Sequence, residues 1–281
     1  MESYALLLEL LFAIITHIDP SSPEGRRCLS ACTCTNHALL GYCQRLLFRD
    51  VELSYLFLLN EDRRIVFCDD QGMTGQKFLH LLDASPHIGS YIENLTITVE
   101  VPTGRRKPFE LATPTHESSS SDLFSLYKIV PRLTNLKGFI TSHTQRAHWS
   151  VLDDCTKSSF VGLFPLLRKL DLFLLVFLLM SVFSDCASLE ELHVWGAETD
   201  LDYLPANVDK VKIRALEVGY GPDPSRKPIA PLFSPPHSPL DISHLRNIKL
   251  TDALLPVSDV DDILKLCSNN LQELDLFLAL H

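Results

Sequence analysis

The chain has 281 residues, of which 46% are hydrophobic and 21% are charged, and this composition excludes an intrinsically disordered protein. Its formal net charge is −10, its pI is about 5.5, and no stripe of Lys and Arg runs along the sequence. Such a chain is poorly suited to neutralising phosphate groups, so we expect no nucleic-acid partner.

Cysteine usage and apolar runs indicate a reduced cytoplasmic or nuclear protein. Of eight cysteines, half crowd into one N-terminal stretch and the others are scattered singly, which makes a poor disulfide framework. The apolar run at residues 172–183 has 12 residues, fewer than the roughly 20 that cross a bilayer. The N-terminal apolar run contains Glu9 and has no basic segment before it. We therefore expect neither a signal peptide nor a membrane partner.

Residues 1–54 predict three short helices followed by a strand. Apolar residues recur at three- and four-residue spacing over residues 6–18, which is typical of an amphipathic helix. Ser21 or Ser22 is expected to cap a second helix. A third helix and an alternating, half-buried strand follow within residues 39–53.

Beyond residue 90 a pattern of the form L-x-x-L-x-L, with Ile or Val at some positions, returns seven times. The central residues are 22 to 41 residues apart, a spacing typical of leucine-rich repeats with inserted loops. Each such repeat forms a short strand and a return segment around a shared core, so we expect a curved stack of mostly parallel strands. The apolar residues 276–280 predict an uncovered strand edge that promotes self-association. The central residues, all assigned to the core, are Leu95, Leu136, Leu170, Leu192, Leu216, Ile248 and Leu274.

Several return segments are predicted to be helical. Amphipathic stripes cover residues 74–85, 123–130 and 258–267, and the last leads directly into a complete L-x-x-L-x-L repeat. Two stretches, near residues 102–122 and 219–240, are polar or rich in proline. Because the repeat pattern resumes after each of them, we interpret both as loop insertions.

Motifs that carry catalysis or hold cofactors are missing from the sequence. It contains no G-x-S-x-G, H-E-x-x-H, Walker A or G-x-G-x-x-G motif in a suitable context, so we expect no enzyme and no cofactor. One N-terminal group has the residue types of a metal site but lacks the paired C-x-x-C ligands of structural zinc. We interpret its members as small residues packed between helices and expect no metal. They are Cys28, Cys32, Cys34, His37 and Cys43.

The N-terminal segment resembles an F-box. Residues 6–15, LLLELLFAII, are similar to the F-box opening L-P-x-E-[LI]-[LI], with Leu7 in place of the proline. Residues 27–51 look like the later F-box helices and the strand after them, with His37 near the place of a usual tryptophan. Residues 78–91 resemble a segment of fungal F-box-like proteins that carry degenerate leucine-rich repeats.

This resemblance implies an α/β chain with an F-box-like helical module over residues 1–54 and an irregular leucine-rich-repeat solenoid over residues 55–281, with a curved, mostly parallel sheet. It further implies that the module docks on the Skp-type adaptor of a Skp–cullin–F-box ubiquitin ligase, while the repeats bind a substrate protein whose identity is unknown. The alternative is a leucine-rich-repeat scaffold that does not bind the adaptor. By the same resemblance, the adaptor contact consists of Leu6, Leu8, Glu9, Leu10, Ile14 and Ile15.

Overall fold

The computed structural model describes most of the predicted repeats. The expected insertions near residues 102–122 and 219–240 lie almost entirely outside the described residues, and so do residues 278–281. The described residues are 2–59, 65–69, 75–100, 125–143, 147–148, 154–173, 175–195, 198–200, 210–219, 238–251 and 257–277.

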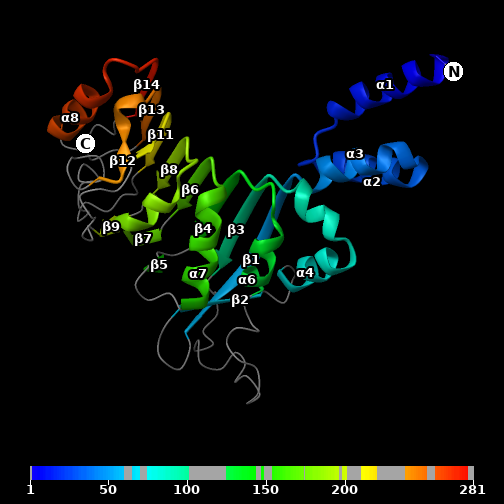
Figure 1. Cartoon of the computed structure of the whole chain (residues 1–281), viewed down its shortest axis with the longest axis horizontal. Coiled ribbons are helices and arrows are strands. Elements are labelled where there is room, and N and C mark those ends of the chain that lie inside the picture. Colours follow the sequence, from blue (N-terminus) through cyan, green and yellow to red (C-terminus); the bar gives the residue numbers. More distant parts are fainter. Residues whose placement is uncertain are drawn as a thin grey trace.

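A nine-stranded sheet forms the body of the structure (Figure 1). Its strand order is β14-β13-β11-β8-β6-β4-β3-β1-β2, and all neighbours are parallel except β2, which pairs antiparallel with β1. The predicted α/β class with a mostly parallel sheet is therefore confirmed. The strands are β1 (Asp50–Leu59), β2 (Ile65–Asp69), β3 (Asn94–Glu100), β4 (Gly138–His143), β6 (Lys169–Phe173), β8 (Glu191–Trp195), β11 (Ala215–Gly219), β13 (Asn247–Thr251) and β14 (Glu273–Phe277).

The sheet is an open row that does not curl, so the predicted curvature is wrong. In a leucine-rich-repeat stack, each strand takes about 4.8 Å along the sheet, while a helix behind it is about 10 Å wide. This difference in width makes the helical layer longer than the strand layer, so the sheet curls. Behind β6 the chain instead forms β7 (Leu175–Leu179) and the 3-10 helix η5 (Met180–Asp185), and behind β8 it begins with β9 (Glu198–Asp200). Because β7 and β9 pair in parallel, the return layer behind β6 and β8 advances at strand spacing, and no wedge forms there.

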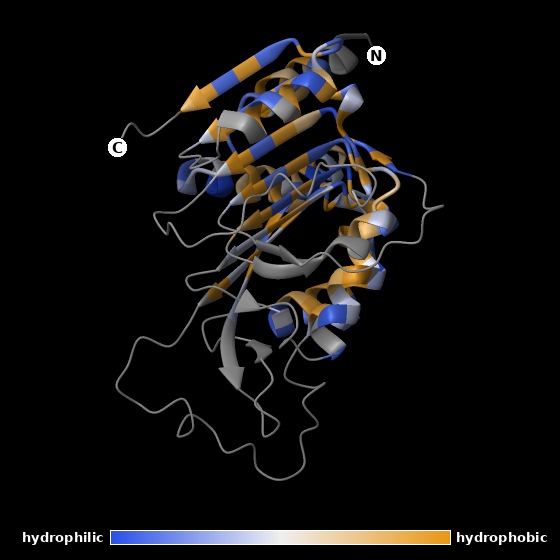
Figure 2. Ribbon diagram, turned by 90° about the vertical axis from the view of Figure 1, so that its left-hand side faces the viewer, coloured by the Kyte–Doolittle hydropathy of each residue, from blue (hydrophilic) through white to orange (hydrophobic). Residues whose placement is uncertain are grey.

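The repeat pattern sets the register of the sheet. Six of the seven predicted central residues stand side by side in one row across seven strands. The exception is Leu136, which is buried just before β4, while Phe139 takes its place in the row. Along β6, β8 and β13 buried and more exposed residues alternate, and Figure 2 shows bands of opposite hydropathy along the strands.

The return segments cover one face of the sheet and close a single core. Helices α4 (Gly75–Ala84), α6 (Leu126–Ile129) and α8 (Val257–Cys267) confirm the three predicted helical stripes, and α7 (Asp154–Leu163) is a further return helix that the sequence did not predict. Their apolar residues, such as Phe78, Phe160 and Ile263, join the inward strand residues in one cluster. The other return elements are η1 (Pro86–Tyr91), η2 (Val130–Arg132), η4 (Phe164–Leu166), η7 (Ile242–His244), β5 (Ala147–His148), β10 (Val211–Lys212) and β12 (Leu240–Asp241).

The N-terminal helices project from the β1 end of the sheet (Figure 1). They are α1 (Glu2–Thr16), α2 (Pro23–Thr35) and α3 (His37–Phe48). Ser22 caps α2 by accepting a hydrogen bond from Gly25 N at 3.0 Å, which confirms the predicted start of this helix. The three helices pack around a small core of their own, made of Ile15, Leu29, Leu39 and Cys43.

The boundary between this module and the repeats lies at the end of α3. The strand that we assigned to the module is β1, which pairs with β3 as part of the large sheet. The module contacts the first repeat through α3 and η1: the Arg45 guanidinium lies 5.4 Å from the centre of the Tyr91 ring, and His87 Nε2 lies 3.3 Å from Gln44 Oε1. The described helices span residues 2–48, and β1, which begins within the predicted module of residues 1–54, belongs to the sheet.

Candidate interaction surfaces

The face of the sheet opposite the helices carries a row of charged side chains. In register on five neighbouring strands lie Asp171, His193, Glu217, Lys249 and Asp275. Each is the middle residue of an L-x-L segment or its equivalent, so its neighbours in sequence point to the opposite face of the sheet. We did not single out these residues from the sequence. The signal that could have found them is the variable position between the two apolar residues of each repeat.

Close contacts link the members of this row. His193 Nδ1 lies 2.8 Å from Asp171 Oδ1 and 3.7 Å from Glu217 Oε2, and Lys249 Nζ lies 2.6 Å from Glu217 Oε1. The hydrogen bond and the charge of Glu217 raise the pKa of Lys249. Despite the short distance to His193, the geometry gives Asp171 Oδ1 no hydrogen-bond donor. The row therefore leaves a carboxylate oxygen unsatisfied beside a titratable imidazole.

An aromatic pair borders the charged row at the ends of β6 and β8. Phe173 is 39% exposed, and its ring centre lies 6.4 Å from that of the half-buried Trp195. Gly219 follows Trp195 in the same register row, and a Cβ there would overlap the indole ring. The glycine thus lets the indole lie across the neighbouring strand, and the pair supplies the large amphipathic contacts that protein interfaces favour.

The open face, by which we mean the outward positions of β1, β3, β4, β6, β8, β11, β13 and β14, is acidic. Among the side chains that the structure describes on this face, seven carboxylates and two lysines give a formal charge of −5 with histidine neutral. A field of this sign attracts basic partners and repels acidic ones. The carboxylates are Asp50, Glu52, Asp171, Glu191, Glu217, Glu273 and Asp275, and the lysines are Lys169 and Lys249.

The residues expected to contact an adaptor do not all face outward. Leu10 and Ile14, one turn apart on α1, are 54% and 61% exposed, and Glu9 beside them is exposed as well. Ile15 is only 3% exposed because it packs in the core of the helical module. The remaining two, Leu6 and Leu8, lie within α1, but their side chains fall outside the described part. An outward contact on α1 therefore centres on Leu10 and Ile14.

Two of the four N-terminal cysteines, Cys32 and Cys43, pack in the core of the helical module. Cys43 is buried, Cys32 is half-buried, and Cys28 and Cys34 are exposed. Burial raises the pKa of both Cys32 and Cys43, and the neighbouring thiols add to the effect. No group of three metal-ligand side chains comes together anywhere in the described residues.

Two further observations bear on function. No helix in the described part of the chain combines the length and the apolar character needed to cross a bilayer. A comparison of the sequence with protein-family models and with curated proteins finds no match.

Proposed function

We propose that this chain is a protein-binding subunit, and not an enzyme, whose open face binds a partner protein. The observation that carries the proposal is the row from Asp171 to Asp275, bordered by Phe173 and Trp195. Parallel strands hold these side chains at fixed spacing, so the surface is ordered before a partner arrives and little entropy is lost on binding. Its acidic charge favours a partner segment that contains Lys or Arg together with apolar residues.

We further propose that the helical module docks the chain on the Skp-type adaptor of a Skp–cullin–F-box ubiquitin ligase. Support comes from the exposed apolar pair Leu10 and Ile14 and from the projection of the helices away from the sheet. An exposed apolar pair on a helix fits a partner groove better than it fits water. The open face would then remain available for the substrate protein.

Calorimetry with a purified Skp-type adaptor tests the docking. We expect binding by the full chain and a loss of at least about tenfold in affinity for a Leu10→Asp/Ile14→Asp variant, since both changes place charges in an apolar contact. The control variant, Ser30→Asp/Ala31→Asp, adds the same charges at exposed positions of α2 and should bind like the parent. A parent chain that does not bind the adaptor would favour the scaffold without ubiquitin-ligase docking.

A peptide array tests the open face. We expect the parent chain to retain peptides that combine basic and apolar residues, and a Glu217→Lys/Asp275→Lys variant to lose them through repulsion. A Glu24→Lys/Asp83→Lys variant reverses two charges on α2 and α4 and serves as the control. Equal retention by both variants would show that the open face is not the binding surface.

A further inference from the structure

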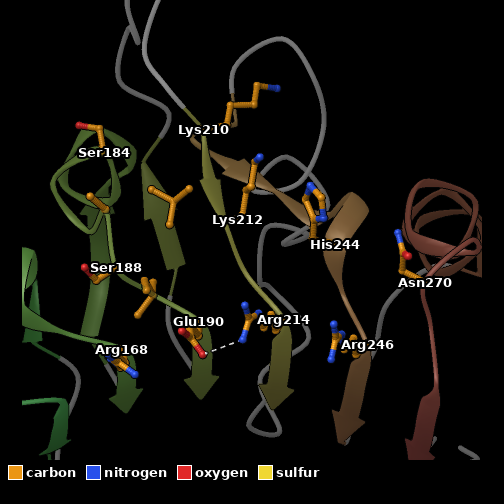
Figure 3. Close-up of a pocket in the computed structure, with 13 residues that line it drawn as sticks. Arg168, Ser184, Ser188, Glu190, Lys210, Lys212, Arg214, His244, Arg246 and Asn270 are labelled. Atoms are coloured by element: carbon orange, nitrogen blue, oxygen red, sulfur yellow. Dashed lines mark hydrogen bonds and ion pairs between the residues drawn. The ribbon is translucent and has the colours of Figure 1, made fainter.

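A groove of about 680 Å³ lies where β6, β8, β11 and β13 begin (Figure 3). Its lining contains five Lys and Arg side chains and one carboxylate, so its formal charge is +4 in a chain of −10. This basic groove is distinct from the open face and from α1. Its charged residues are Arg168, Glu190, Lys210, Lys212, Arg214 and Arg246.

The repeat register brings these residues together. Arg168, Glu190, Arg214 and Arg246 each stand directly before a strand of the large sheet. Their backbones form a continuous ladder, in which each N–H donates to the previous carbonyl over 2.8, 2.7 and 2.8 Å. Side chains 78 positions apart in sequence therefore lie within a few strand spacings of one another. Figure 3 shows Lys210, Lys212 and His244 on the other side of the groove.

Little of this positive charge is neutralised within the protein. Glu190 Oε2 lies 3.3 Å from Arg214 Nη1, but both side chains are exposed, so the pair is weak. Over the stretches that the structure describes, Arg168, Lys210 and Arg246 have no ion-pair partner. Asp241, near Lys212 and 3.7 Å from His244 Nε2, adds one negative charge beside the groove and still leaves the groove with a net positive charge.

We propose that this groove binds a compact small molecule that carries several phosphate groups. Five converging cations exceed what a single phosphate requires, and the volume lies in the range of small-molecule sites, about 300–1,000 Å³. Among the described residues, the lining includes no Phe, Tyr or Trp, the large aromatic side chains on which successive nucleic-acid bases stack. Leu189 and Val211 are buried beneath the groove, so it lacks the apolar pockets that anchor peptide side chains. This site does not depend on the proposed protein-binding function.

Titration calorimetry with tripolyphosphate as the probe tests the proposal on the full chain. We expect one binding site whose affinity falls as salt rises, because bound phosphates displace counterions. A Lys212→Gln/Arg246→Gln variant should weaken binding by at least about tenfold, since two charge-assisted contacts are lost. A Lys128→Gln/Lys265→Gln variant removes the same charge from α6 and α8 and should change the affinity by less than about twofold.

Three outcomes would overturn the proposal. The first is no binding of tripolyphosphate at low salt, and the second is equal weakening in both variants, which would indicate a diffuse charge effect. The third is tighter binding of a doubly phosphorylated peptide or a single-stranded RNA than of tripolyphosphate, which would assign the groove to that ligand. Circular dichroism checks that the variants fold. If the double variant does not, the exposed single change Lys210→Gln replaces it and should still weaken binding.

Discussion

Leu170 and Leu274 belong to the same register row but differ in their surroundings. Leu170 on β6 is fully buried, whereas Leu274 on the edge strand β14 is 39% exposed. The sequence pattern assigned both to the core, and for Leu274 the structure corrects this. A residue on an edge strand lacks the neighbouring repeat that covers the others.

The two leucines therefore respond differently to the same substitution. We expect Leu170→Asp to destabilise the chain by roughly 3–5 kcal/mol or to prevent folding, because it buries an unpaired charge. Leu274→Asp should cost less than about 1.5 kcal/mol, since its carboxylate reaches water. Urea unfolding of both variants measures the difference. Equal losses of stability would mean that β14 is covered like β6.

The cysteines should differ in reactivity according to their burial. Burial and then the nearby Asp185 carboxylate raise the pKa of Cys186 from an ordinary 9.0 to about 12. Because the folded protein keeps this thiol protonated, the resulting stability is complete below pH 9 and is lost as the pH rises toward 12. We expect a thiol reagent at neutral pH to label Cys28 and Cys34 in the folded chain, but not Cys186 or Cys267.

Mass spectrometry after labelling, with and without urea, checks this order. The unfolded chain serves as the control, since all its thiols should then react. A Cys186→Ala variant should also lose less stability than the parent when the pH is raised above 9, because the residue that titrates is gone. Rapid labelling of Cys186 under native conditions would contradict its place in the core.

At the level of elements, two glycines test how strands and helices tolerate a methyl group. A Cβ at Gly219 on β11 would overlap the Trp195 ring, whereas one at Gly162 on α7 would make an ordinary contact with Val130. We expect Gly219→Ala to displace the indole and cost roughly 1–3 kcal/mol. Gly162→Ala should be neutral or stabilise the helix by up to about 1 kcal/mol.

Thermal unfolding and indole fluorescence together check these expectations. The chain has two tryptophans, so the measurement uses a Trp149→Phe background in which Trp195 is the remaining indole. The emission of Trp195 should change in the Gly219→Ala variant and stay constant in the Gly162→Ala variant. A Gly219→Ala variant with parental stability and emission would rule out close packing of the indole over β11.

Most elements of this fold follow from local sequence, and so does the register of every strand in the predicted row except β4. Apolar periodicity located α4, α8 and six strand centres, because packing one face against a core imposes that periodicity. In the fourth strand the pattern centre, Leu136, and the register residue, Phe139, differ by three positions. Apolar spacing alone cannot tell which of the two residues stands in the register row, since both are apolar and buried. Thr141 is likewise a buried polar residue in an otherwise apolar row, and only the structure places its Oγ1 3.4 Å from Phe173 N.

At the scale of the whole molecule, the sequence did not predict on which surfaces the charged side chains gather. The net charge of −10 and the lack of a Lys and Arg stripe predicted a chain poorly suited to neutralising phosphate groups, yet the structure gathers five cations in one groove. The alternation Lys210-x-Lys212-x-Arg214 was a local sign, but Arg168 and Arg246 join it only through strand pairing. The carboxylates of the open face are equally dispersed along the chain. A parallel repeat sheet therefore sorts an acidic sequence into surfaces of opposite sign.

The molecule also divides its apolar residues between two cores. Leu29 lies in the small cluster formed by α1, α2 and α3, and Leu192 lies in the large cluster behind the sheet. Both side chains are fully buried, so the same substitution perturbs either core to a similar degree. The contacts of Tyr91 with Arg45 and of His87 with Gln44 are exposed or partly exposed, and Phe48 at the end of α3 packs against the large cluster.

We therefore expect the helical module to unfold without the sheet. A Leu29→Asp variant should lose amide protection in α1, α2 and α3 and keep it in β6, β8 and β11, because an unpaired charge disrupts only the cluster that contains it. A Leu192→Asp variant should lose protection throughout the sheet. Hydrogen exchange followed by mass spectrometry reads both variants segment by segment. If Leu29→Asp also lowered amide protection in the strands, the two clusters would form one cooperative unit. The contacts between α3 and η1 would then couple them more strongly than their exposure implies.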